Sequence, residues 1–127
     1  MGIVSIRGAI TVAKNSKEDI LEATRELLMA IIEANQIERQ NIIQIHFSAT
    51  KDLDAAYPAV AARAIGLTGT SLMCFQEMYV VGSLEQCIRA SVLVNQEGLE
   101  RIGVKHQYLK GAAVLRPDLA NKENKDE

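Results

Sequence analysis

The amino-acid sequence predicts an α+β fold: a mixed sheet of about five strands, covered on one face by one long helix plus a short helix. Two patterns support this prediction. Several short segments alternate apolar and polar residues as strands do, and one long segment repeats apolar residues at helical spacing. Because one long helix covers only one face of such a sheet, the other face is expected to be solvated or buried against another subunit.

The chain begins with a strand and the long helix. Alternating apolar residues predict a strand from Ile3 to Val12, in which Gly8 interrupts the apolar face. Ser16 and Asp19 have the spacing of a capping box, and apolar residues then recur at helical spacing as far as Ala34. This is the only long helix that the sequence predicts.

Five shorter elements complete the predicted fold. A second alternating strand runs from Ile43 to Ala49, with the odd-numbered residues apolar. A short helix is expected from Pro58 to Ile65, since proline suits the first helical position and Gly66 suits a C-terminal cap. The remaining strands are predicted at Leu72–Met78, Ile88–Asn95 and Lys105–Leu109.

Length and composition limit the classes of protein that fit. The 127 residues correspond to about one domain, assigned to residues 1–119, followed by a mobile polar tail at residues 120–127. A net charge of -2 lacks the basic surplus of a nucleic-acid-binding protein. The longest uncharged run, Ala64 to Gln76, is shorter than the roughly 18 residues of a membrane span. We therefore expect a cytoplasmic protein that binds neither nucleic acid nor membrane.

The sequence contains no phosphate-binding loop, zinc-protease motif or EF-hand, so neither a cofactor nor a metal is expected. Cys74 and Cys87 are interpreted as free thiols in or near a core. His46 and His106 lie outside any nucleophile motif and are expected to be ordinary surface or pairing histidines.

Two arginines are candidates for chemistry. Arg7 and Arg89 lie on strand faces opposite the apolar residues, and Glu77 follows the strand that carries Cys74. Spacing alone leaves two interpretations open. These charges are either solvated residues of an outer face, or, because small residues flank both arginines, guanidinium groups with room to bind an anion through two hydrogen bonds.

Six segments in order resemble the small monofunctional chorismate mutases of the AroH class. They span Ile6 to Leu119, nearly the whole chain. The segments are Ile6-Arg7-Gly8-Ala9, Ser48-Ala49-Thr50, Tyr57-Pro58-Ala59 with Arg63, Cys74-Phe75-Gln76-Glu77-Met78, Cys87-Ile88-Arg89, and Val114-Leu115-Arg116-Pro117-Asp118-Leu119. The resemblance implies a homotrimer, a pseudo-α/β barrel with active sites between neighbouring subunits, and rearrangement of chorismate, a dicarboxylate, to prephenate in phenylalanine and tyrosine biosynthesis.

The resemblance also implies roles for individual residues. Arg89 would contact the breaking ether oxygen and a carboxylate, and Arg7, with Tyr108, would hold a carboxylate. Glu77 and Cys74 would receive the ring hydroxyl. The other implied substrate-binding residues are Tyr57 and Arg63 from the neighbouring subunit, Met73 beside the hydroxyl, and Leu115 and Arg116 in the C-terminal segment that closes over the site.

Three residues depart from the family pattern: Val60 replaces a frequent lysine, Tyr57 a phenylalanine, and Met73 a smaller residue. The missing lysine is expected to affect substrate affinity more than the chemical step.

A pericyclic reaction needs no nucleophile, base or cofactor, only a cavity that holds the reactive conformer and stabilises the developing charge. Two alternatives share the predicted fold, an imine-deaminase-type trimeric hydrolase and a non-catalytic carboxylate-binding protein.

Overall fold

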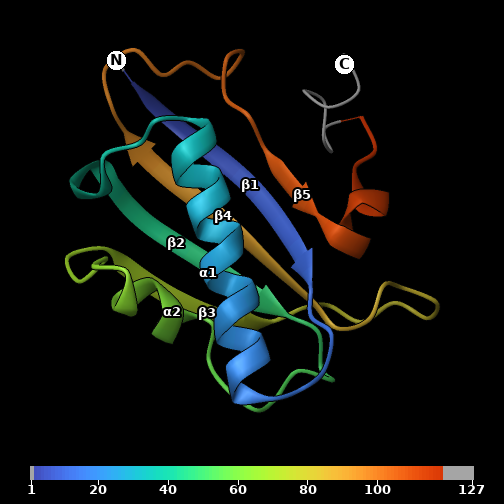
Figure 1. The fold of residues 1–127 in the computed structure, drawn as a ribbon. Coiled ribbons are helices and arrows are strands. Elements are labelled where there is room, and N and C mark those ends of the chain that lie inside the picture. Colours follow the sequence, from blue (N-terminus) through green and yellow to red (C-terminus); the bar gives the residue numbers. More distant parts are fainter. Residues whose placement is uncertain (1, 119–127) are drawn as a thin grey trace.

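The computed structural model describes residues 2–118 and confirms the α+β prediction (Figure 1). Two α-helices pack on one face of a five-stranded sheet with the strand order β3-β2-β4-β1-β5. The elements in chain order are β1 (Ile3–Thr11), α1 (Lys17–Ala34), the 3-10 helix η1 (Arg39–Asn41), β2 (Ile42–Ala49), α2 (Ala59–Ala64), β3 (Ser71–Gln76), β4 (Cys87–Asn95), β5 (Gln107–Leu109) and the 3-10 helix η2 (Lys110–Leu115).

The sheet is mixed, with β4 at its centre. β4 pairs antiparallel with both β1 and β2, whereas β1 pairs parallel with β5 and β2 pairs parallel with β3. In this register Arg89 lies opposite Ala9 on one side and opposite Ser48 on the other, and Arg7 lies opposite Ser91. Because side chains two residues apart on a strand point the same way, the pairing brings Arg7 and Arg89 onto one face.

The long helix α1 begins and ends where the sequence predicts. The Ser16 hydroxyl accepts a hydrogen bond from the Asp19 amide at 3.1 Å and lies 3.0 Å from the Asp19 carboxylate, and Asn35 caps the other end. The helix turns Leu27, Leu28 and other apolar side chains onto the sheet, where they are buried. Burial of this apolar stripe provides most of the helix's stability, because isolated helices of this length are marginal in water.

Gly8 allows α1 to approach the sheet closely. A Cβ atom at this position would lie 2.8 Å from the Gln107 carbonyl oxygen, 2.9 Å from Leu27 Cδ1 and 3.0 Å from Ile31 Cδ1. Those distances are shorter than ordinary van der Waals contact. The glycine that interrupts the apolar pattern therefore serves helix-to-sheet packing, directly beside Arg7.

One predicted face is wrong, and one residue is more buried than its face suggests. A register shift between Ile42 and Gln44 forms a β-bulge, so that Ile42 is buried and Ile43, expected to face the core, is exposed. On β1, Ala9 lies on the face of Arg7, as the alternation predicts, but it is fully buried instead of exposed. It lies under η2, in a small cluster whose buried members are Ala9, Cys87, Tyr108 and Ala112.

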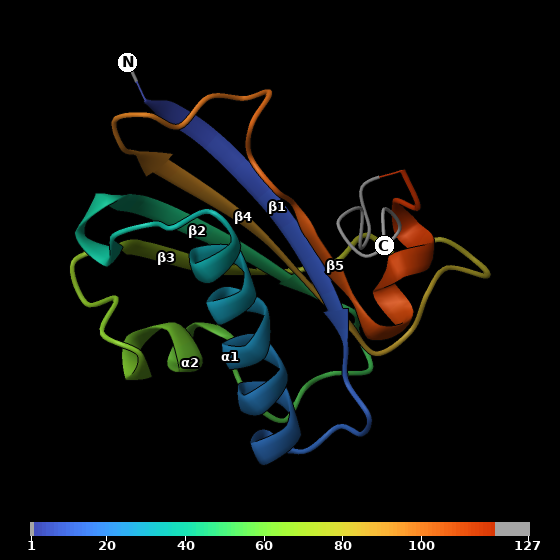
Figure 2. The same ribbon diagram turned by 45° about the horizontal axis from the view of Figure 1, so that its top comes forward.

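The sequence does not predict η2, which lacks an apolar repeat (Figure 2). The expectation that the second face of the sheet is solvated or subunit-covered is thus incomplete, since the chain's own C-terminal segment covers one corner. Element boundaries shift by one or two residues. The largest shifts are at β3, which ends at Gln76 and not Met78, and at β5, which begins at Gln107 and not Lys105; α2 spans Ala59–Ala64, with Pro58 and Ile65 as its caps. The predicted tail lies outside the described residues, and no helix within residues 2–118 is long and apolar enough to cross a membrane.

Candidate active site

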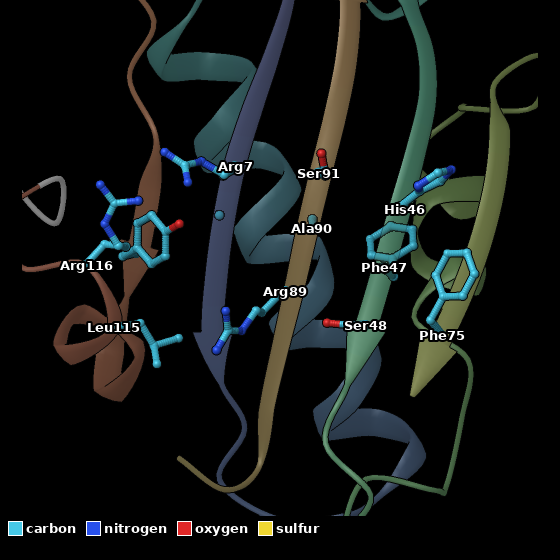
Figure 3. Close-up of a pocket in the computed structure, with 12 residues that line it drawn as sticks. Arg7, His46, Phe47, Ser48, Phe75, Arg89, Ala90, Ser91, Leu115 and Arg116 are labelled. Atoms are coloured by element: carbon cyan, nitrogen blue, oxygen red, sulfur yellow. The ribbon is translucent and has the colours of Figure 1, made fainter. Parts of the chain in front are cut away.

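A pocket of about 440 Å³ opens on the face of the sheet opposite α1 (Figure 3). Strands β1, β4 and β2 form its floor, and the C-terminal segment forms one wall. Figure 3 shows Arg7, Arg89, Leu115 and Arg116 toward the β1 and β5 side, and Ser48, His46 and Phe75 toward the β2 and β3 side. Five of the predicted site residues line this pocket: Arg7, Arg89, Tyr108, Leu115 and Arg116.

Three guanidinium groups from separate parts of the chain share the pocket. Arg7 comes from β1, Arg89 from β4 and Arg116 from the segment after η2. Guanidinium groups stay protonated at all physiological pH values and bind carboxylates through paired hydrogen bonds. Three of them in one cavity in an otherwise acidic protein form a site suited to an organic anion that carries more than one carboxylate.

Glu77 joins the site through Ser48 and Arg89. The Ser48 hydroxyl donates a hydrogen bond to Glu77 Oε1 at 2.5 Å, and Arg89 Nε lies 3.4 Å from the same oxygen. The Glu77 amide also donates to the Ala49 carbonyl at 2.9 Å, which fixes the chain just after β3. Since Glu77 contacts Arg89 through Nε, the terminal nitrogens of the guanidinium are the ones placed to meet a ligand.

Tyr108 and His106 flank Arg7 on the β5 side. Tyr108 is almost completely buried, and its ring lines the pocket. His106 Nδ1 accepts a hydrogen bond from the Arg7 amide at 2.9 Å. Burial lowers the pKa of His106, and the nearby charges of Arg7 and Arg116 lower it further. His106 is thus a pairing histidine, one of the two roles that the sequence suggested for it.

Arg116 already forms the type of contact that a carboxylate ligand would make. Its Nε and Nη2 atoms donate to the two carboxylate oxygens of Asp118 at 3.1 and 2.9 Å. This hydrogen bonding raises the pKa of Arg116. The pair lies at the solvent-exposed rim, where such an ion pair contributes little to stability. A substrate carboxylate could therefore replace Asp118 at small cost.

Five predicted site residues do not line the arginine pocket within one chain: Tyr57, Arg63, Met73, Cys74 and Glu77, of which Glu77 meets the pocket only through Ser48 and Arg89. The Cys74 side chain packs against the main core, on the α1 side of the sheet. Tyr57 and Cys74 both line a second cavity of about 460 Å³, and Tyr57 is 72% exposed. Arg63 is exposed in the last turn of α2.

The sequence reasoning missed several residues that line the pocket: His46, Ser48, Phe75 and Ser91. His46 packs edge-on against Phe75, with ring centroids 5.4 Å apart. The signal was present in part, because His46, Ser48 and Ser91 alternate with apolar residues on strands β2 and β4. Only the strand register shows that their faces coincide with that of Arg89. Within the described residues, no group of three His, Cys, Asp or Glu side chains is arranged to hold a metal ion.

Fold and site together define a class of small α+β proteins with a cationic pocket on the helix-free face of the sheet. Residues 3–119 match the family described as chorismate mutase type I, and the chain belongs to this family. Chorismate mutase AroH of Bacillus subtilis (strain 168) is 42% identical over 125 residues, which cover 98% of each chain. Chorismate mutase AroH of Thermus thermophilus is 44% identical over 115 residues, covering 90% of this chain and 93% of that one.

A solved structure agrees with these relatives. The chorismate mutase from Clostridium thermocellum superposes with a TM-score of 0.85 at 49% identity, covering 87% of this chain and 98% of that chain. The resemblance read from the sequence is therefore confirmed for family and fold.

Proposed function

We infer that this chorismate mutase, an isomerase that converts chorismate to prephenate, carries out the reaction in the arginine pocket. The observation that carries the proposal is the convergence of Arg7, Arg89 and Arg116 with Glu77 on one face of the sheet. Chorismate has two carboxylates, a ring hydroxyl and an ether oxygen. The pocket offers cations for the carboxylates and the ether oxygen, and a carboxylate acceptor for the hydroxyl.

The rearrangement breaks the bond between the ether oxygen and the ring and forms a carbon–carbon bond in one pericyclic step. No proton is transferred, so the protein needs no acid, base or nucleophile. Negative charge builds on the ether oxygen as its bond to the ring breaks. A guanidinium at Arg89, held beside that oxygen before the reaction, stabilises this charge without reorganisation. Binding of chorismate in its reactive conformer, with the two ends of the new carbon–carbon bond close together, supplies the remaining acceleration.

Arg7 and Tyr108 hold one carboxylate of the substrate. Arg116 exchanges its contact with Asp118 for the second carboxylate, and Arg116 and Leu115 then close the pocket. Glu77 accepts a hydrogen bond from the ring hydroxyl, with its carboxylate oriented by Ser48. The Cys74 thiol is turned to the core, so that a contribution from Cys74 to the hydroxyl has to come from its main chain on the edge strand β3.

The second half of the site is proposed to come from a neighbouring subunit in a homotrimer. Met73 and Phe75 expose about half of their surface on the edge strand, and Tyr57 is exposed beside it. Apolar side chains exposed together on one sheet edge are typical of a surface that another chain covers. Tyr57 and Arg63 would then complete the wall of the neighbour's arginine pocket, and Met73 would lie beside the ring hydroxyl.

Incubation of the purified protein with chorismate tests the activity. Loss of the substrate's ultraviolet absorbance, together with formation of prephenate, is the expected result. An imine hydrolase or a non-catalytic carboxylate-binding protein of the same fold would leave chorismate unchanged. Unchanged chorismate would therefore contradict the proposal.

Mixed trimers test whether the site is shared. Arg89→Ala and Arg63→Ala chains are unfolded together, refolded and compared with each variant refolded alone. In a shared site, one type of junction combines an intact Arg89 with the intact Arg63 of the next chain, so activity exceeds the average of the separate samples. Activity equal to that average, with mixed trimers confirmed by mass, would rule the shared site out.

A further inference from the structure

We propose that His106 is a positioning residue for Arg7, acting through the main chain of β1; this role rests on the proposed function of the pocket. The Nδ1 atom of His106 accepts the Arg7 amide hydrogen at 2.9 Å. Regular pairing between β1 and β5 begins one residue later, where Gly8 faces Gln107. The imidazole nitrogen thus accepts the Arg7 amide hydrogen where a main-chain carbonyl would accept it if the β1–β5 pairing continued. The Arg7 side chain enters the pocket at this point.

The contact matters because β5 is short. Only three residue pairs join it to β1, and β5 carries Tyr108, which is proposed to act with Arg7 on the same carboxylate. The next residue after Arg7, Gly8, lies so close to Leu27 and to the Gln107 carbonyl that a Cβ atom would not fit there. His106 therefore closes the end of the pairing that sets the separation of Arg7 from Tyr108.

The geometry fixes the protonation state of the ring. An acceptor at Nδ1 requires the neutral tautomer, with its proton on Nε2. Protonation would place a hydrogen on Nδ1, facing the Arg7 amide, and would remove the acceptor. The charged groups that face the ring are Arg7 on β1 and Arg116 after η2, and Lys105 precedes it in the chain. The two arginines oppose a positive charge on the ring.

The sign of the pH effect follows. Burial and the two arginines lower the pKa of His106 from its ordinary value of 6.5, so that the ring is neutral at pH 7 and the contact is formed. The contact is lost only when the pH falls through this lowered pKa and the ring takes up a proton. Added positive charge alone would strengthen attraction for a dicarboxylate. A fall in affinity in acid therefore identifies the loss of positioning.

Two variants separate positioning from packing. His106→Asn keeps an acceptor near the Nδ1 position but does not titrate, whereas His106→Leu has no acceptor. With chorismate at about pH 7.5, we expect His106→Leu to raise KM about tenfold, the effect of one lost hydrogen bond, with kcat within about threefold. His106→Asn should stay within about threefold in both constants.

The pH profile gives the second readout. In the wild type, kcat/KM should fall in acid as the pH drops through the lowered pKa of His106, and His106→Asn should lack this fall. The chain has two histidines, so a fall that persists in His106→Asn would belong to another group and overturn the proposal. Wild-type kinetics in His106→Leu would overturn it as well.

Nitrogen chemical shifts of the His106 ring in the wild-type protein test the contact without any assay. Near pH 7 the shifts should show an unprotonated Nδ1 and a protonated Nε2, and the Arg7 amide signal should move with ring titration. A ring protonated at Nδ1, or an Arg7 amide that ignores the titration, would refute the positioning role. Neither result depends on chorismate mutase activity, so failure of this inference is distinct from failure of the proposed function.

Discussion

The two faces of the sheet differ in chemistry although the same strands build both. Toward α1, β1 presents Val4, Ile6 and Ile10, all buried against the helix. Toward the pocket it presents Ser5 and Arg7, both exposed. The helix-covered face is a core of buried apolar side chains, whereas the other face is buried and apolar only in the corner under η2 and elsewhere carries charged, polar and half-exposed apolar residues.

This difference separates stability from catalysis. The apolar face supplies the burial energy that fixes strand register, and the register decides which side chains meet in the pocket. The open face contributes little burial, and its charged residues are held by neighbours rather than by packing. Substitutions on the pocket face should thus impair catalysis without unfolding the protein, and substitutions on the helix face should do the reverse.

Arg89→Ala should have the largest effect on activity. Removal of one preorganised donor to a developing oxyanion typically lowers turnover by two to three orders of magnitude. Arg89→Lys should also be impaired, because an ammonium does not reproduce the planar fork. Steady-state kinetics with chorismate and thermal unfolding measure the two consequences. Arg25→Ala, at an exposed position on α1, is the matched control and should leave both unchanged.

The division between a catalytic pocket face and a stabilising helix face is contradicted if Arg89→Ala unfolds the protein or retains near-normal turnover. In the first case the arginine would be a structural residue. In the second it would be a surface charge.

Leu27→Ala tests the helix face. Leu27 is fully buried between α1 and the sheet, next to Gly8. Truncation of a buried leucine costs about 2–5 kcal/mol through lost burial and the cavity left behind. Denaturant unfolding should show this loss, while kcat of the folded variant stays within about threefold. A kcat reduced as strongly as in Arg89→Ala, with unchanged stability, would contradict the division between the faces.

Cys87 tests the dry corner of the pocket face. Burial raises the pKa of its thiol from 9.0 to about 11. The folded state therefore disfavours the thiolate, and the stability present below pH 9 is lost as the pH rises toward 11. Two pKa units correspond to about 2.7 kcal/mol. Cys87→Ala should lack this loss of unfolding free energy at alkaline pH, as measured by denaturant titration. Identical pH dependence in the two proteins would show that the thiol is accessible to solvent.

The smallest expected effect is that of pH on turnover. With no proton transferred in the reaction, kcat should stay nearly flat from about pH 6 to pH 8. Any acid limb should fall in kcat/KM instead. A bell-shaped kcat profile centred near neutrality would indicate acid–base catalysis on the pocket face.

Much of the fold could be predicted from local patterns. The period-two alternation in β1 and β4 and the capped apolar repeat of α1 are properties of consecutive residues. Arg7 and Arg89 were identifiable as candidates for the same reason. Ile43 was misplaced because a bulge shifts the register within one strand, and no local signal marks it.

The site required information that lies between segments. Ser48 reaches Glu77 across 29 positions, and His106 reaches Arg7 across 99. Such contacts depend on strand order and register, which alternation alone does not determine. The family resemblance identified Cys74 as a site residue but not that its side chain turns to the core.

A crystal structure with a stable bicyclic dicarboxylate, an ether-bridged analogue of the transition state, tests the central claim most directly. The account predicts the ether oxygen within hydrogen-bond distance of the Arg89 guanidinium, one carboxylate on Arg7, the hydroxyl on Glu77, and Tyr57 of a neighbouring chain against the ring. An analogue bound elsewhere, or bound in the pocket with Arg89 turned away from the ether oxygen, would contradict it.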